Sequence, residues 1–168
     1  MNARLAAMLF LPLLAAASGH AAAQQAVILV RHAELQGAAM AEPKNLPLSE
    51  AGAARAQRLA MLLKEAGVSA IYVTDFARTQ ETADPIAREL GHSPTVLPKG
   101  DPQELVDRLR KQHASQTVLL VGHTDTLPGL LQALGHPAEV KIDPQDYGNV
   151  FVVSPKQQGA PTLLRLRY

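Results

Sequence analysis

Arginine and histidine side chains follow three short apolar segments of this chain within a few residues. The segments are residues 26–30, 70–74 and 117–121, and the side chains that follow them are Arg31 with His32, Arg78, and His123. A guanidinium group binds phosphoryl oxygens through two parallel hydrogen bonds and stays charged at any working pH. An imidazole nitrogen can attack phosphorus and form a phosphohistidine, which water then hydrolyses. The residue types therefore predict phosphate capture and phosphoryl transfer to a histidine.

This chemistry requires that the three segments be neighbouring strands of one parallel sheet. Each segment is a run of mainly β-branched and aliphatic residues, which is typical of strands buried on both faces. The carboxyl ends of parallel strands meet at one edge, where open α/β sheets bind ligands. We therefore expect both histidines and both arginines in one pocket. Positive charge nearby would disfavour imidazolium and keep a nitrogen lone pair available.

Helical and strand signals alternate along the rest of the chain. Helices are expected at 50–66, 76–90, 102–113 and 126–134. Ser49, Asp75 and Asp101 are the expected caps of the first three, and Gly67 and Gly91 are expected to end the first two. Pro85 should kink or divide the second helix. Further strands are expected at 95–97, 149–153 and 162–167. Residues 33–48 are predicted to form a loop that covers the site. This order predicts an α/β fold, a three-layer αβα sandwich with a mainly parallel sheet, an antiparallel edge and helices on both faces.

The first 23 residues have the pattern of a secretory signal peptide. Arg4 precedes an apolar run of about 13 residues, too short to span a bilayer, and Ala21–Ala23 resembles a cleavage site before Gln24. We therefore expect a signal peptide at 1–23, a single domain at 24–168, and a periplasmic or secreted protein with no stable membrane association after cleavage.

Charge and cysteine content exclude several classes of function. Without Arg4 the chain has 15 basic residues (one fewer than 16) and 15 acidic ones, a balance that provides no general attraction to nucleic acid. There is no cysteine, so the chain has no disulfide, no thiol nucleophile and no cysteine-based metal site. We expect no cofactor and no metal.

An ordered set of motifs makes the chain resemble the histidine phosphatase superfamily, also called the phosphoglycerate mutase-like family. The motifs are Arg31-His32-Ala33-Glu34, residues 45–52 (NLPLSEAG), Thr74-Asp75 with Arg78-Thr79 and Thr82-Ala83, and Gly122-His123. The resemblance implies the phosphoglycerate mutase-like fold and a metal-independent phosphatase. It implies His32 as the phosphorylated nucleophile, Arg31 and Arg78 as phosphate ligands, and His123 as a second catalytic residue that hydrogen-bonds the phosphoryl oxygens.

The general acid is not assigned by the resemblance. Many family members carry an acidic proton donor in a long insertion, whereas only about 26 residues separate Gly91 from Thr117 here. Asp125 and Glu34 are possible proton donors and Asp101 is a more distant one, although Asp125 could equally cap the helix that follows it. Because it is short and lacks this insertion, the chain resembles the small phosphohistidine phosphatases of the family more than its sugar-acid mutases. The expected substrate is a phosphorylated small molecule or a phosphohistidine-bearing partner.

The same residues are also compatible with two other functions. A metallohydrolase could use His32, His123, Asp125 and Glu34 as ligands, because histidine and carboxylate bind zinc, although arginines beside a cation disfavour this. A phosphate-binding pseudoenzyme module with little turnover would keep the pocket but lack a strong acid. Phosphate binding without hydrolysis would distinguish this module from an enzyme.

Overall fold

The computed structural model describes residues 26–37, 44–156 and 158–168 of this 168-residue chain. Its strands are β1 (Ala26–Arg31), β2 (Val68–Thr74), β3 (Thr95–Leu97), β4 (Thr117–Gly122), β5 (Asn149–Ser154) and β6 (Thr162–Arg167), and its helices are α1 (Glu50–Leu63), α2 (Ala77–Leu90), α3 (Pro102–Gln112) and α4 (Leu127–Ala133). The expected signal peptide lies outside the described residues. None of the described helices is long and apolar enough to cross a membrane.

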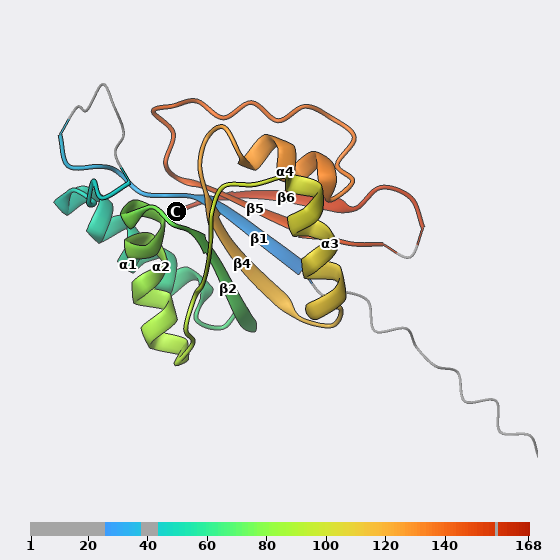
Figure 1. The fold of residues 1–168 in the computed structure, drawn as a ribbon, viewed down its shortest axis with the longest axis horizontal. Helices are drawn as coiled ribbons and strands as arrows, with labels where there is room; N and C mark the ends of the chain where they lie inside the picture. The colour runs from blue at the N-terminus through green and yellow to red at the C-terminus, as the bar shows by residue number, and fades with distance from the viewer. Residues whose placement is uncertain (1–25, 38–43, 157) are drawn as a thin grey trace, which may run out of the picture.

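One sheet of order β3-β2-β4-β1-β5-β6 forms the centre of the molecule (Figure 1). Strands β1 to β4 are parallel neighbours, whereas β5 runs antiparallel to β1, and β6 runs antiparallel to β5. The register pairs Arg31 with Gly122 at the carboxyl ends of β1 and β4. The prediction of a mainly parallel sheet with an antiparallel edge is confirmed.

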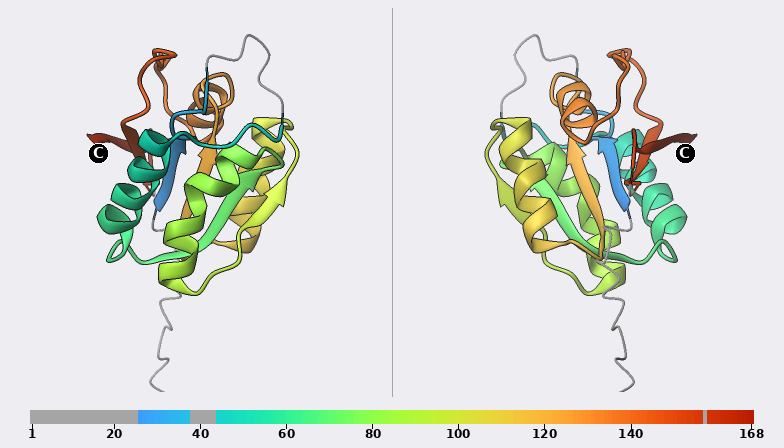
Figure 2. Two further views of the ribbon diagram at one scale, coloured as in Figure 1. Left: turned by 90° about the vertical axis from the view of Figure 1, so that its left-hand side faces the viewer. Right: turned by 90° about the vertical axis from the view of Figure 1, so that its right-hand side faces the viewer.

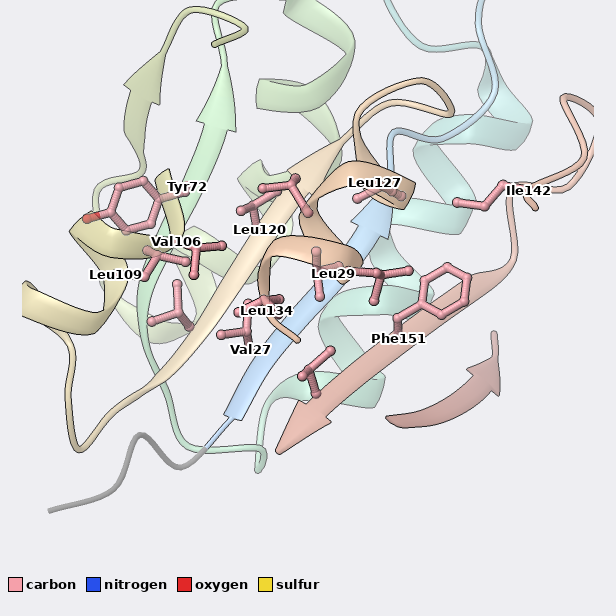
Figure 3. Close-up of a cluster of buried hydrophobic side chains, with 14 residues drawn as sticks. Val27, Leu29, Tyr72, Val106, Leu109, Leu120, Leu127, Leu134, Ile142 and Phe151 are labelled. Atoms are coloured by element: carbon pink, nitrogen blue, oxygen red, sulfur yellow. The ribbon is translucent and has the colours of Figure 1, made fainter. Parts of the chain in front are cut away.

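The helices cover both faces of this sheet, as expected from right-handed crossovers (Figure 2). On one face, Ile28 and Val30 of β1 belong to a buried cluster with α1 and α2. On the other face, Val27 and Leu29 belong to a cluster with α3 and α4 (Figure 3). Because successive side chains of a strand point to opposite faces, the continuous apolar sequence of β1 supplies both clusters. The predicted three-layer sandwich is therefore confirmed.

Local capping signals set three helix boundaries as predicted. The Ser49 hydroxyl accepts from the Gly52 amide at 3.1 Å at the start of α1. The Asp101 carboxylate accepts from the amides of Gln103 and Glu104 at 2.7 and 3.1 Å at the start of α3. Gly91 ends α2 with a positive φ of 65°, a conformation that glycine adopts without strain.

The structure departs from the predicted elements in three places. Helix α1 ends at Leu63, its last buried residue, because a tighter turn follows in which the Ala66 amide bonds the Leu63 carbonyl. Asp75 does not cap α2, since its carboxylate pairs with Lys44 instead. Helix α2 is neither divided nor restarted at Pro85, because buried side chains on both sides of that residue pack against the sheet and α1.

Only the two ends of the predicted loop 33–48 are described. Leu35 and Leu48 pair as an isolated antiparallel bridge, so the loop leaves and rejoins the domain at one place. The Lys44 carbonyl accepts from the Ala77 amide at the start of α2. Residues 38–43 lie outside the described residues, so the expectation that this loop covers the site stays a prediction.

Candidate active site

The two histidines meet at the carboxyl ends of β1 and β4. Their ring centroids lie 5.3 Å apart with an interplanar angle of 61°. The backbone holds them in place, because the His32 amide donates to the Gly122 carbonyl at 2.9 Å. Both side chains are almost fully buried, at 1% exposure for His32 and 3% for His123. Arg31 and Arg78 are buried as well, so four polar side chains concentrate at this edge of the sheet.

His32 is held in one tautomer by its own main chain. Its Nδ1 lies 2.8 Å from the Ala33 carbonyl oxygen. A carbonyl oxygen only accepts, so Nδ1 carries the proton of the neutral ring and Nε2 carries the lone pair. The Nε2 of His32 is therefore the nitrogen available to attack phosphorus.

Both histidines are neutral well below neutral pH. Burial lowers the pKa of His32 to about 4, with Arg31, Arg78 and Lys99 lowering it further against the opposing Ala33 hydrogen bond. Burial also lowers the pKa of His123 to about 3, with help from the charges of Lys99 and Arg78. The electrostatics thus favour a neutral nucleophile surrounded by fixed positive charge.

Arg31 is oriented by the connection between α4 and β5. One guanidinium nitrogen donates to the Pro144 carbonyl at 2.6 Å, and its carbon lies 4.0 Å from the centroid of the Tyr147 ring. The Tyr147 ring is also 6.1 Å from the ring of His32. This connection therefore fixes the direction of the Arg31 guanidinium group near His32.

Arg78 is placed by the first turn of α2. Its guanidinium carbon lies 4.3 Å from the centroid of the Phe76 ring. The Thr82 hydroxyl donates to the Arg78 carbonyl at 2.6 Å and accepts from the Ala33 amide at 2.9 Å. Thr82 thus joins the helix that carries Arg78 to the residue that follows His32, which gives the Thr82-Ala83 motif a physical role.

His123 is held by side chains of neighbouring elements rather than by its own backbone carbonyl. Its Nε2 lies 2.9 Å from the Thr74 hydroxyl oxygen, which lies 2.9 Å from the Thr79 hydroxyl oxygen. Thr79 donates to the carbonyls of Phe76 and Thr74, at 2.9 and 3.0 Å, so its oxygen accepts from Thr74. Thr74 then accepts from His123, which places the proton of the neutral ring on Nε2.

The Nδ1 of His123 is consequently a lone-pair nitrogen in the neutral ring. It is buried and has no hydrogen-bond partner among the described residues. The negative charge of a bound phosphoryl group would favour its protonation, because an opposite charge stabilises imidazolium. Nδ1 can therefore accept from a protonated phosphoryl oxygen or donate to an ionised one.

Glu34 lies in an ion pair rather than at the phosphoryl site. Its carboxylate binds the Arg55 guanidinium of α1 through contacts of 2.7 to 2.9 Å. Partial burial opposes ionisation, but the Arg55 hydrogen bonds prevail and the pKa of Glu34 is lowered. Gly52 allows the close approach of α1 to this segment, since an added Cβ would lie 2.2 Å from the Glu34 carbonyl oxygen.

Asp125 is also held as a carboxylate. It pairs with Lys99 at 2.9 Å, and its side chain is 68% exposed. Partial burial raises its pKa, but the Lys99 hydrogen bond and charge lower it on balance. A general acid must be protonated before the leaving group departs, whereas the lowered pKa values of Glu34 and Asp125 keep both carboxylates ionised, so neither has the environment of a general acid. Asp101, the more distant possibility, is occupied in capping α3.

Lys99 is a site residue that the sequence analysis did not identify. Its ammonium nitrogen lies 5.2 Å from the Phe76 ring centroid, and the Phe76 and His123 ring centroids lie 4.9 Å apart. Lys99 follows the three-residue strand β3, and its position depends on the strand order, which places β3 beside β2. A lysine in a short turn carries no sequence signal for this role.

The described residues contain no group of three or more histidine and carboxylate side chains arranged to hold a metal ion. The four ligands considered for a metallohydrolase are instead divided among separate contacts. Asp125 binds Lys99 and Glu34 binds Arg55, while the two histidines face arginines. This arrangement does not favour the metallohydrolase alternative.

The family model described as "Histidine phosphatase superfamily (branch 1)" matches residues 27–99. This segment contains His32, Arg31 and Arg78, three of the four residues expected to bind or attack the phosphoryl group. Over these residues the match confirms the resemblance to the histidine phosphatase superfamily that the motifs indicated, and the fold agrees with it. A comparison with curated proteins found no match.

Solved structures of phosphatases share the fold. The protein histidine phosphatase SixA complexed with tungstate is 17% identical, with a TM-score of 0.67 over 84% of this chain and 96% of that chain. A candidate phosphohistidine phosphatase SixA from Agrobacterium tumefaciens is 22% identical, with a TM-score of 0.61 over 84% and 98%. A candidate alpha-ribazole-5'-P phosphatase from Escherichia coli is 19% identical, with a TM-score of 0.69 over 86% and 96%. The family match supports a phosphatase, and these structures confirm its α/β fold.

Proposed function

We propose that this protein removes a phosphoryl group from a phosphoester or phosphoramidate through a phosphohistidine intermediate on His32. The hydrogen bond from His32 Nδ1 to the Ala33 carbonyl carries the proposal, because it leaves a buried, neutral Nε2 beside Arg31 and Arg78. The SixA structure complexed with tungstate supports an oxyanion site in a protein of this fold, since tungstate is a tetrahedral oxyanion like phosphate.

The reaction follows from the positions of the side chains. The arginines bind the phosphoryl oxygens, and His32 Nε2 forms a bond to phosphorus as the bond to the leaving group breaks. The leaving group departs with the electron pair of that bond and takes a proton from water. Water then attacks the phosphohistidine, which releases phosphate and restores the His32 lone pair. No metal ion takes part in this scheme.

Phosphoenzyme trapping tests this proposal. The protein, incubated with a labelled aryl phosphate and quenched, should carry an acid-labile label, whereas His32→Ala should carry none and should lose turnover. A chelator should leave turnover of the wild-type protein unchanged. Retained turnover in His32→Ala would refute the proposed nucleophile.

A phosphate-binding module with little turnover is the second possibility, and the ion pairs of Glu34 and Asp125 favour it because they keep both carboxylates ionised and leave neither as a general acid. Vanadate binding without hydrolysis of aryl phosphates or of a phosphohistidine peptide would support that module. Turnover of any of these substrates at an enzymatic rate would exclude it.

We also propose that the protein is exported and is periplasmic or secreted, with residues 1–23 removed. The support is the sequence pattern of those residues. N-terminal sequencing of the protein from fractionated cells should begin at Gln24. A cytoplasmic protein that keeps residue 1 would contradict export.

A further inference from the structure

A cavity of about 190 Å³ lies beside the candidate active site, between α3 and the carboxyl-terminal halves of β2 and β4. Most of its lining side chains are apolar, and they include Leu97, Pro98, Leu105, Leu120 and Leu130. Protein interiors contain few voids larger than a water molecule, and a dry apolar cavity of roughly 150 Å³ binds benzene. The space therefore has the size and chemistry to hold one aromatic ring or a branched aliphatic group.

Two residues that line the cavity hydrogen-bond the two histidines, although neither histidine lines it. Thr74 lines it, and the Thr74 hydroxyl lies 2.9 Å from His123 Nε2. Gly122 lines it as well, and the Gly122 carbonyl accepts from the His32 amide at 2.9 Å. A single residue thus separates the cavity from each histidine.

The cavity lies toward β2 and β3, on the side of β4 that faces away from β1. His32 extends from β1, and the sheet continues through β4 and β2 to β3. In-line displacement places the leaving group opposite the attacking nitrogen. A leaving group on the β4 side of His32 would therefore reach the cavity between β2, β4 and α3.

Lys99 lies between the cavity and the two histidines. It lines the cavity, and its ammonium nitrogen lies 5.2 Å from the ring of Phe76, which contacts His123. Its carboxylate partner Asp125 is exposed, so Lys99 can exchange this partner for an anionic oxygen of the substrate.

We propose that this cavity receives the organic group of the substrate, so that the protein prefers phosphomonoesters whose alcohol carries an aromatic or branched aliphatic group. This inference rests on the proposed phosphatase function and specifies the substrate class of the same site. Lys99 then binds the oxygens at the junction between the phosphoryl group and the apolar group.

Benzyl phosphate and methyl phosphate test the proposal, because both leave as primary alcohols and differ by one ring. We expect kcat/KM to be about tenfold to hundredfold higher for benzyl phosphate, the gain expected from burying a ring of this size. Leu105→Trp, which fills the cavity from the half-buried face of α3, should bring the ratio close to one. Leu97→Phe, which fills it from β3, is a second variant should Leu105→Trp not fold. Leu164→Trp on the exposed edge strand β6 is the matched control and should keep the wild-type ratio.

Binding of the non-hydrolysable benzylphosphonate and methylphosphonate separates this proposal from the proposed function. Tighter binding of benzylphosphonate than of methylphosphonate, lost in Leu105→Trp, would support the cavity assignment. If neither ester were hydrolysed in the same experiment, only the proposed phosphatase function would be contradicted. Equal turnover of both esters together with equal binding of both phosphonates would overturn the cavity assignment and leave the phosphatase intact.

Discussion

The carboxyl ends of β1 and β4 present the same residue type in the same degree of burial, but they hold it in different ways. His32 hydrogen-bonds the carbonyl of the next residue in its own chain, whereas His123 hydrogen-bonds the Thr74 hydroxyl on a neighbouring strand. A backbone acceptor cannot be removed by substitution, while a hydroxyl can. The orientation of His32, the proposed nucleophile, is therefore fixed by its own main chain, whereas the orientation of His123 depends on the sequence of other elements.

Substitution of each histidine by alanine should produce the largest difference in turnover between the β1 and β4 strand ends. His32→Ala removes the group that bonds phosphorus, and we expect turnover to fall by at least about ten-thousandfold. His123→Ala removes stabilisation of developing charge, and we expect a loss of about a hundred- to thousandfold. Rates on an aryl phosphate and trapping of the phosphoenzyme measure both effects.

Phosphoenzyme formation provides the control for this pair. His123→Ala should still form the labelled phosphoenzyme, more slowly, whereas His32→Ala should form none. Labelling of His32→Ala at the wild-type level would contradict the assignment of roles.

The pH dependence of stability should show what the two histidines share. The folded pKa of His32 is about 4 against an ordinary value of 6.5, so the unfolded chain binds more protons between these values. Its contribution is fully present above about pH 6.5 and is lost as the pH falls toward 4. At pH 5 the unfolding free energy should be about 2 kcal/mol lower than at pH 7 for this group alone.

Denaturant unfolding at both pH values measures this loss. His32→Gln and His123→Gln should each make the free energy of unfolding less dependent on pH, since the pKa of His123 is lowered as well, to about 3. Identical pH dependence in the wild type and both variants would show that neither histidine is kept neutral by the fold.

Removal of the Thr74 hydroxyl should affect only the β4 side of the comparison. Thr74→Val leaves His123 Nε2 without its partner, and we expect kcat to fall by about tenfold, the cost of one hydrogen bond to a reacting group. Thr74→Ser keeps the hydroxyl and should restore most of the activity. The ¹⁵N chemical shifts of the rings should report a changed tautomer for His123 and an unchanged one for His32. Equal kcat in Thr74→Val and Thr74→Ser would mean that Thr74 does not position His123.

The smallest effect is expected at Asp125. Its carboxylate is largely exposed and paired with Lys99, so Asp125→Asn should lower kcat by less than about threefold. A general acid would cost a hundredfold or more and would remove the basic limb of the pH–rate profile. A loss of that size would identify Asp125 as the missing proton donor.

Much of the fold could be predicted because its signals are local. The apolar runs of β1 and β4, the caps Ser49 and Asp101, and the terminator Gly91 act within a few residues of their own positions. The course of α2 could not be predicted in the same way, because side-chain packing on both sides of Pro85 outweighs the local preference of proline.

The same distinction between local signals and tertiary contacts applies to the candidate site. The sequence indicated His32, His123, Arg31 and Arg78, because each follows a recognisable strand. It did not indicate how they are held, since the Thr74 and Thr79 hydroxyls, Lys99 and the Pro144 carbonyl contribute through tertiary contacts. The ion pairs of Glu34 and Asp125 likewise depend on elements distant in sequence, namely α1 and the turn after β3.

The contact between Arg31 and the Pro144 carbonyl joins residues 113 positions apart. During synthesis from the N-terminus, a chain that extends just past β4 already contains both histidines and Arg78 but lacks the carbonyl that orients Arg31. Contacts between residues so distant in sequence form late, because closing a long loop is entropically costly. Phosphate capture should therefore begin only when the C-terminal segment has been made and docked, so unfinished chains remain inactive.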